Sequence, residues 1–469
     1  MAERARKQNN GQIMHLLLIV LFLFLSLCLL IKGCTSSDNN DKDKTGNLLP
    51  QDPITDTTPV QPNGPSVVAT ASIGITGSMY IQDDVIRSAL TEDAAYDFTD
   101  SFSIIKNSYE SFDYMIAHLE TTFGGTEAGE FTGKDSFNAP DEFAAAMKAA
   151  GIDMVLTSNN HCYDTQHSGF LRTQEVLKQN GLDYTGTKTL SDDASYLIKD
   201  INGIKIGMIC YTHETGDTAA GNKTIRDITV ASEDTDLINS FNYRQMDQFY
   251  SELTAAIAEM ESAGADFVIS YIHWGNEFDL VPSNTQKKIA QNLCDLGIDI
   301  IIGSHPHTVQ PVELLTSTTG ETTFCFYSLG NALSSQRRKN IPASPNGYTE
   351  DGMILSIQFQ RWSDGSVKIS DLNATPLWVD AEITEESSSV TILPVDVSYN
   401  FYPALSEFAD SVNGVIDPGR APLNIEAHTP SDPTQISASY SRTMDTILEG
   451  LNQCRQHLGL TPVSNISGN

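Results

Sequence analysis

Histidine residues stand directly after two apolar runs in this 469-residue sequence. His305 and His307 follow the run Ile300–Ile302, and His273 follows the run "DFVISYI". Neutral imidazole, carboxylate and amide oxygen are ligands for divalent metal ions. Metal ions held in this way activate water and clamp a phosphoryl or acyl oxygen. The residue types therefore suggest metal-dependent hydrolytic or transfer chemistry.

Three further apolar runs end in polar side chains of the same kinds. The run "MVLTS" precedes Asn160, His161 and Asp164, "YMIAHLE" ends on Glu120, and "FCFYSLG" precedes Asn331. A histidine beside an amide ligand can protonate a leaving group, so His161 is a catalytic candidate, and we group Asp164 with it. Each of these residues taken alone is better explained by a turn, a cap or packing. Their recurrence at the ends of separate runs favours one shared site.

The elements that must position these residues alternate between strands and helices. Short apolar runs indicate buried strands, and the pair Asn202-Gly203 predicts the turn of a hairpin. Helices are predicted for "APDEFAAAMKAAG", "SGFLRTQEVLKQNG", "MDQFYSELTAAIAEMESAG" and "NTQKKIAQNLCDLG". This alternation predicts an α/β layered fold. In such folds ligands bind outside the carboxyl ends of the strands, where the candidate residues stand.

Composition divides the chain into five predicted parts. Residues 1–12 form a basic cytoplasmic tail, and residues 13–32 form an apolar membrane anchor long enough to span a bilayer. Residues 33–66 form a disordered stalk rich in Asp, Thr, Asn and Pro, residues 67–395 form the folded domain, and residues 396–469 form a C-terminal extension with a closing helix.

The basic tail predicts a single-pass protein of the cell membrane, with the C-terminal domain outside the cell. Cys34 leaves open an alternative in which the chain is a lipoprotein, although Lys32 fits poorly in such a site. Five scattered cysteines of the domain have no pairing pattern, and most of them are predicted to be small core residues: Cys162, Cys210, Cys294, Cys325 and Cys454.

The net charge of −32 argues against nucleic-acid binding, which requires a basic surface. The same charge repels any polyanion. An anionic ligand would therefore need a metal ion or a local group of cations.

Three segments together resemble the poly-γ-glutamate capsule synthesis protein CapA family: "FNAPDEFAAAMKAAGIDMVLTSNNHCYDTQHSGFLRTQEVLKQNGLDYTGT", "VISYIHWGNEFDLVPSNTQKKIAQNLCDLGIDIIIGSHPHTVQPVELL" and "FYSLGNALSS". The resemblance covers residues 67–380 and implies a fold similar to the calcineurin-type metallophosphoesterases, a two-sheet sandwich flanked by helices. It implies a proton-donor role for His161. It implies metal-site roles for Glu120, Asn160, His273, His305 and His307.

The resemblance also implies a divalent metal (Mn, Fe, Zn or Mg) and a role in making or exporting an anionic capsule polymer. The partners would be that polymer or its synthesis and export machinery, with the membrane contacted through the N-terminal helix.

One motif departs from the family pattern. Where family members read Gly-Asp after the first strand, this chain reads Gly77-Ser78. A hydroxyl is a poorer ligand for a divalent metal than a carboxylate. Asp83 and Asp84 could substitute, but their position favours the opening of a helix. Two interpretations follow: a metal-dependent hydrolase or transferase, or a non-catalytic accessory subunit with a degenerate metal site. A purely structural envelope protein is opposed by the grouped histidines.

Overall fold

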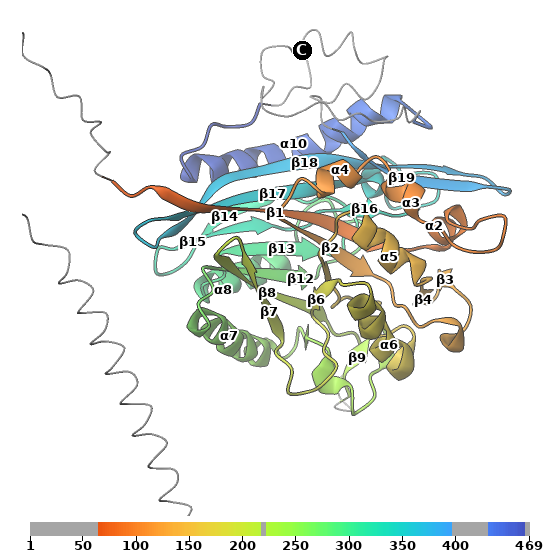
Figure 1. Cartoon of the computed structure of the whole chain (residues 1–469), viewed down its shortest axis with the longest axis horizontal. Helices are drawn as coiled ribbons and strands as arrows, with labels where there is room; N and C mark the ends of the chain where they lie inside the picture. Colours follow the sequence, from red (N-terminus) through yellow and green to blue (C-terminus); the bar gives the residue numbers. More distant parts are fainter. Residues whose placement is uncertain (1–63, 217–221, 396–429, 465–469) are drawn as a thin grey trace, which may run out of the picture. The chain divides into compact units, whose positions relative to one another are not determined.

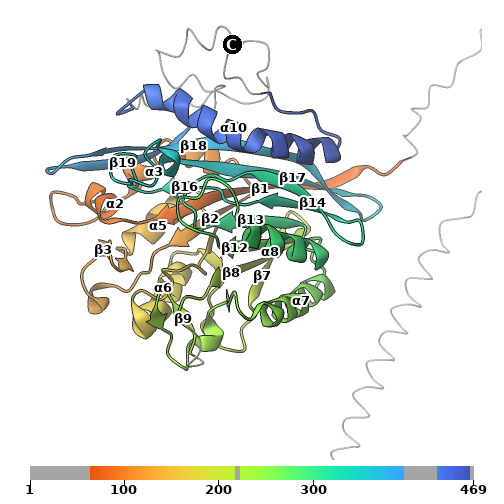
Figure 2. The same ribbon diagram turned by 180° about the vertical axis from the view of Figure 1, so that it is seen from behind.

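A computed structural model describes residues 64–216, 222–395 and 430–464. The predicted basic tail, the anchor and nearly all of the stalk lie outside these residues. Among the residues it describes, no helix has the length and apolar character needed to cross a membrane. The described chain forms two large β-sheets with helices beside them (Figures 1 and 2), which confirms the predicted α/β layered architecture.

The first sheet is mixed, with one parallel and one antiparallel half. Its strands are β1 (Val67–Tyr80), β2 (Tyr114–Glu120), β5 (Met154–Leu156), β6 (Asp183–Thr185), β16 (Asn331–Leu333), β17 (Asp351–Trp362), β18 (Val367–Ile383) and β19 (Ser388–Pro394). Their order is β19-β18-β17-β1-β2-β5-β6, and β16 pairs with β1. The pairs β1–β2, β2–β5, β5–β6 and β1–β16 are parallel. The carboxyl ends of β1, β2 and β5 therefore meet at one edge.

The second sheet is mainly parallel. Its strands are β7 (Tyr196–Ile201), β8 (Ile204–His213), β11 (Ser240–Phe241), β12 (Phe267–His273), β13 (Ile300–Ser304), β14 (Val312–Thr316) and β15 (Thr322–Phe326). The order is β11-β8-β12-β13-β15-β14, with β7 beside β8. Only β7 and β14 pair antiparallel with their neighbours, β8 and β15. The predicted hairpin is confirmed, because β7 and β8 pair antiparallel around Asn202 and Gly203, whose φ values are 54° and 85°.

Two small hairpins lie outside these sheets. The first is formed by β3 (Thr132–Gly133) and β4 (Phe137–Asn138), and the second by β9 (Thr224–Ile225) and β10 (Ile228–Thr229).

The main core lies between the two sheets. Ile75 and Ile116 of the first sheet share one buried cluster with Ile269 and Ile302 of the second. The other face of each sheet is covered by helices. The helical residues Phe143 and Leu253 are buried there, Phe143 against the first sheet and Leu253 against the second.

The helices are α2 (Asp83–Ser88), α3 (Thr99–Phe102), α4 (Lys106–Tyr109), α5 (Glu142–Ala149), α6 (Gln166–Gln179), α7 (Met246–Ser262), α8 (Asn284–Asp295) and α10 (Thr434–His457). Short 3-10 turns occur at Thr126–Ala128, Thr235–Leu237 and Tyr348–Glu350.

The predicted closing helix is present as α10 and packs on the strands β14, β17 and β18 (Figure 1). Ile447 and Leu451 of α10 are fully buried in the main core cluster. A Cβ atom at Gly450 would lie 1.8 Å from the carbonyl oxygen of Val312, so only glycine permits this close approach of helix and strand. The five cysteines of the domain are all buried and free, as the sequence predicts.

Candidate metal centre

The parallel pair β1–β2 places four polar side chains on one face of the first sheet. Ser78 lies opposite His118 in the ladder, and Tyr80 lies opposite Glu120. Side chains two residues apart in a strand point to the same face, so all four share it. Ser78, His118 and Glu120 are buried, and Tyr80 is 9% exposed.

The pair β12–β13 places histidines at the corresponding end of the second sheet. His273 is the last residue of β12 and lies opposite Ser304, the last residue of β13. Its Nδ1 is 2.8 Å from the hydroxyl of Ser304, which fixes the ring. His305 and His307 follow directly and are also buried.

A turn after β5 brings in Asn160 and His161. The side chain of Asn159 donates to the carbonyl of Leu119 at 2.7 Å and accepts from the backbone N–H of His161 at 2.9 Å. This turn directs Asn160 toward the second sheet, where its Oδ1 is 3.0 Å from Nε2 of His273.

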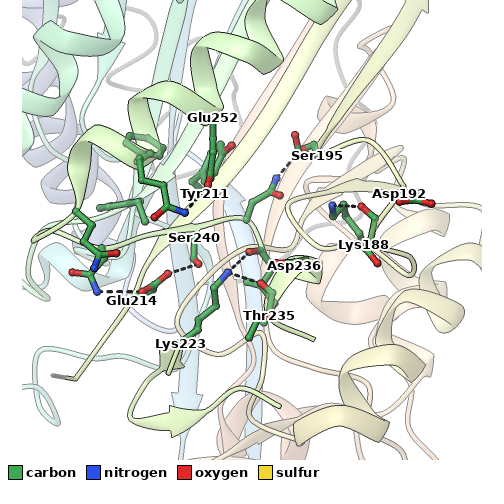
Figure 3. Close-up of a pocket in the computed structure, with 18 residues that line it drawn as sticks. Lys188, Asp192, Ser195, Tyr211, Glu214, Lys223, Thr235, Asp236, Ser240 and Glu252 are labelled. Carbon is green, nitrogen blue, oxygen red and sulfur yellow. Dashed lines mark hydrogen bonds between the residues drawn. The ribbon is translucent and has the colours of Figure 1, made fainter. Parts of the chain in front are cut away.

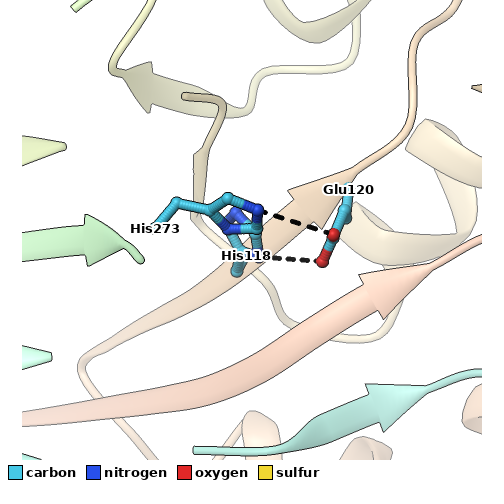
Figure 4. Close-up of side chains that lie close together, drawn as sticks. All are labelled: His118, Glu120 and His273. Carbon is cyan, nitrogen blue, oxygen red and sulfur yellow. Dashed lines mark ion pairs between the residues drawn. The ribbon is translucent and has the colours of Figure 1, made fainter. Parts of the chain in front are cut away.

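Glu120 lies beside three imidazole groups, and Figure 4 shows it next to those of His118 and His273. Its Oε1 is 3.8 Å from Nε2 of His273 and 3.7 Å from Nε2 of His307, and its Oε2 is 3.6 Å from Nδ1 of His118. The ligand atoms of His118, Glu120 and His273 all lie within 4.8 Å of one another. These three side chains form a group that can hold a metal ion, built from elements of both sheets.

Several buried polar atoms in and beside this group lack the hydrogen bonds that such atoms need. Both oxygens of Glu120, Nε2 of His307, Nε2 of His118 and Nδ1 of His305 are buried without a hydrogen-bond partner among the described residues. An unpaired buried carboxylate is costly, and a cation is one means of satisfying it. The donor set therefore fits a divalent metal, and the identity of the metal is not fixed by it.

The hydrogen bonds around His307 also support binding of a metal ion. The amide nitrogen of Asn331 donates to the carbonyl of Thr349 at 2.9 Å and to Oε1 of Gln336 at 3.0 Å, so its oxygen faces Nδ1 of His307 at 3.0 Å. Nδ1 then carries a proton, so Nε2 is the nitrogen of His307 that can bind a metal ion, and it faces Glu120. A cation between Nε2 and the carboxylate would satisfy both groups.

The buried environment keeps the imidazoles of His118, His273 and His305 neutral. Burial lowers the pKa of His118 to about 3. Burial, together with the neighbouring histidines, holds the pKa values of His273 and His305 well below their usual range. Burial also raises the pKa of Glu120. Neutral imidazole is the form that binds metal.

His305 and His307 reach the site by a different geometry from the one predicted. An extended His-Pro-His segment would place both rings on one side by strand alternation. Instead β13 ends at Ser304, and His305 and His307 adopt φ values of 92° and 55°. The turn sends His305 toward the rings of His213 and His273, at centroid distances of 4.9 and 4.7 Å, and sends His307 toward Glu120. Such left-handed backbone at non-glycine residues is concentrated at functional sites.

His161 and Asp164 form a pair beside this group. Nδ1 of His161 is 2.7 Å from Oδ2 of Asp164, which also accepts from the backbone N–H of Phe137 at 2.8 Å. The ring of Tyr80 lies close to both parts of the site, 5.6 Å from the ring of His161 and 4.5 Å from that of His307. The structure thus brings together the residues proposed from the sequence, including Asn331 through its contact with His307.

Two histidines of the site were missed in the sequence. His118 stands inside the apolar run "YMIAHLE", a pattern that predicts a core residue, and His213 ends β8, a strand of the predicted hairpin. The spacing of His118 and Glu120, two residues apart in a strand, was the available signal. His213 places its ring 6.0 Å from that of His273.

The missing family aspartate is not replaced by its neighbours. Asp83 and Asp84 open α2, as the helix interpretation predicts. Asp83 accepts from the backbone N–H of Gly133 at 2.6 Å, and Asp84 pairs with Arg87 at 2.8 Å. Ser78 itself faces the site, because its hydroxyl is 3.0 Å from Nδ1 of His118.

Comparison with known proteins identifies relatives. Residues 72–336 match the family described as bacterial capsule synthesis protein PGA_cap. The PGA biosynthesis protein CapA of Bacillus subtilis (strain 168) is 22% identical over 306 residues, which are 64% of this chain and 72% of that protein. The capsule biosynthesis protein CapA of Bacillus anthracis is 28% identical over 200 residues, which are 42% of this chain and 44% of that protein.

A solved structure also resembles the chain, although weakly. The NAD nucleotidase NadN of Haemophilus influenzae aligns over 80% of this chain and 67% of its own, with a TM-score of 0.39 and 14% sequence identity. A likeness of this size assigns no activity to the chain.

Proposed function

Because the chain belongs to the bacterial capsule synthesis protein PGA_cap family, we propose that it acts in the biosynthesis or export of a capsule polymer of the poly-γ-glutamate type. In this proposal it is anchored in the cell membrane by residues 13–32, with its folded domain outside the cell, and acts there as a metal-dependent hydrolase or transferase of metallophosphoesterase type. The observation that carries the enzymatic proposal is the unpaired, buried Glu120 among neutral imidazoles.

We assign the metal to a set of nitrogen and oxygen donors around Glu120. The donors are Glu120, His118, Asn160, His273 and His307, with His305 beside His273. A set rich in imidazole suits zinc or iron better than magnesium. A divalent cation held there would polarise a phosphoryl or acyl oxygen of the substrate.

His161 is the proposed proton donor. Asp164 holds Nδ1 of His161 at 2.7 Å, so the proton available to a leaving group is on Nε2. In this arrangement Asp164 orients the ring and does not itself contact substrate.

A groove beside the loop after β12 offers room for a polymer. It has a volume of about 910 Å³ and is lined by Tyr243, Gly275, Asn276 and Lys288, among others. Gly275 is two residues beyond His273, and the ring of Tyr243 lies 6.0 Å from that of His213. The groove therefore adjoins the imidazole groups.

Ser78 favours the alternative function, a non-catalytic accessory subunit that binds the polymer or its synthesis machinery. The hydroxyl of Ser78 is a weaker ligand for a divalent metal than a carboxylate at the same position, so the affinity of the site for metal would be lower. In that case the imidazole groups would be the remains of a metal site.

Elemental analysis of the purified full-length chain tests the two functions, with Ser78→Asp and Ser78→Ala measured beside the natural protein. An enzyme should contain at least one equivalent of metal, and Ser78→Ala should keep it because His118 and Glu120 supply the donors on β2. Little or no metal in the natural protein, restored by Ser78→Asp, would refute the enzymatic proposal and support the accessory one.

A further inference from the structure

We propose that Arg226 binds an oxyanion group of the substrate, a carboxylate or a phosphate, beside His161. This inference rests on the proposed function, because it names the charge class of the substrate that the same site accepts.

The backbone at Arg226 is explained by its side chain and not by turn preference. Arg226 and Asp227 form the two-residue loop of the β9–β10 hairpin, in which Ile225 pairs with Ile228. Their φ values are 49° and 62°. Such a turn favours Asn-Gly, and an L-residue with a long side chain is strained there. Strain of this kind is typical of residues that a site requires.

The guanidinium of Arg226 is directed at the His161–Asp164 pair. Its Nη1 is 3.0 Å from Oδ2 of Asp164 and 3.4 Å from Nδ1 of His161, and its Nη2 donates to the carbonyl of Asp135 at 2.7 Å. These contacts use at most three of the five N–H groups of the guanidinium. The side chain of Asp164 is 1% exposed and that of Arg226 is 32% exposed, so the cation keeps a free surface beside a buried carboxylate.

The surrounding charges explain why a cation is needed here. Burial raises the pKa of Tyr80, the charges of Glu120, Glu277 and Asp164 raise it further, and the charge of Arg226 lowers it. Arg226 is the positive charge among them. Without it, the site would present carboxylates and neutral imidazoles to an anionic substrate, in a chain whose net charge is −32.

The hairpin does not depend on Arg226 for its position. Lys223, at its base, donates from Nζ to the carbonyls of Thr235 at 2.6 Å and Ile238 at 2.9 Å, at the wall of a cavity of about 590 Å³ (Figure 3). Ile225 is buried in a cluster that includes Phe170. Removing the Arg226 side chain should therefore leave the hairpin in place.

Calorimetric titration of the full-length chain tests the inference with two probes, inorganic phosphate and the dipeptide γ-glutamylglutamate. Arg226→Asn should weaken binding of a probe about tenfold or more, because it removes a charge-assisted contact. Asn tolerates a positive φ, so the melting temperature should stay close to that of the natural protein. Arg226→Lys should recover part of the affinity, because lysine keeps the charge without the planar fork.

Arg87→Asn is the matched control, because Arg87 on α2 also pairs with an aspartate, Asp84, and its side chain is 39% exposed. It should bind both probes as the natural protein does. Weaker binding of both probes by Arg226→Asn assigns a general oxyanion site, and weaker binding of the dipeptide alone assigns a carboxylate. The inference is overturned if Arg226→Asn binds both probes normally, or if the natural protein binds neither.

Each titration is run after EDTA treatment and again with added Mn²⁺. If probe binding depends on Arg226 but the protein takes up no added Mn²⁺, this inference stands while the metal-dependent function fails. If the protein binds stoichiometric metal but probe binding does not depend on Arg226, the metal-dependent function stands while this inference fails.

Discussion

At the scale of single residues, Glu120 is a buried carboxylate that has no hydrogen-bond partner among the described residues. Its carboxylate is fully buried and has three imidazole nitrogens between 3.6 and 3.8 Å away, none of which forms a hydrogen bond with it. The hydrogen bond of Nδ1 of His307 to Asn331 leaves Nε2 of that ring facing the carboxylate. A bound cation would satisfy the carboxylate and this nitrogen together.

Glu120→Gln should therefore abolish stabilisation by metal. Glutamine has nearly the same shape, and it removes the charge that the cation neutralises. The natural protein should gain about 2.7 kcal/mol when free metal is at 100 times its dissociation constant. Differential scanning calorimetry with EDTA and then with Zn²⁺ or Mn²⁺ measures this gain.

Glu110→Gln is the control for this measurement, because Glu110 is paired with Lys106 at 2.7 Å and is outside the site. This variant should keep the full gain. An equal gain in Glu120→Gln would place the metal elsewhere.

Most of the residues of the site could be predicted from the sequence, but their arrangement in space could not. Glu120, Asn160 and His273 follow apolar runs, and the topology of parallel strands requires such ends to meet. His118 escaped notice because a buried histidine within a strand looks the same in sequence whether it packs or binds metal. Its role depends on Glu120 and on a second sheet, which no local pattern specifies.

At the scale of elements, β12, β13 and β15 are tied together at their amino ends by Asp299. Its Oδ2 accepts from the backbone N–H of Val268 at 2.7 Å, and its carbonyl accepts from that of Phe324 at 3.0 Å. Burial raises the pKa of Asp299 to about 6, compared with 3.8 for an ordinary aspartate. The folded protein therefore holds this proton more tightly than the unfolded chain does.

Asp299→Asn should stabilise the protein in a pH-dependent way. The contribution of the natural Asp299 is fully present below pH 4 and is lost as the pH rises through about 6, because the buried carboxyl must then ionise. Asparagine keeps the acceptor for Val268 without ionising. The free energy of unfolding of the variant should rise relative to the natural protein by roughly 1–3 kcal/mol between pH 4 and pH 7. Urea titrations at several pH values measure this difference, and a constant difference would contradict the assignment.

The elements themselves were largely predictable, and their exceptions have physical reasons. Apolar runs and amphipathic spacing identified α5, α6, α7, α8 and the central strands, because burial imposes those patterns locally. The turn after Ser304 and the β9–β10 hairpin were not predicted, because His305, His307 and Arg226 adopt backbone angles that their own types disfavour. Contacts across the site hold the two histidines there, whereas Lys223 and the buried Ile225 hold the hairpin.

At the scale of the whole molecule, charge is the dominant feature. The chain has 60 acidic residues and only 28 lysines and arginines, so 32 carboxylates would lack a basic partner even if every cation were paired. The ion pairs of Arg442 with Asp351 and of Arg455 with Asp371 fasten α10 to strands of the first sheet, and their arginines are largely buried. Such pairs are screened less by salt than the exposed charges are.

Raising the concentration of NaCl from about 0.02 M to about 0.5 M should therefore increase the melting temperature, because the Debye length falls to a few ångström and the repulsion among unpaired carboxylates weakens. Choline chloride should act equally, since screening does not depend on the cation, whereas an effect of one salt alone would indicate specific ion binding. A melting temperature that falls with salt would mean that attractive surface pairs outweigh the net charge. The same field opposes the approach of an anionic polymer, so a site that accepts one must supply its own positive charge, and Arg226 and a bound metal ion are the groups placed to do so.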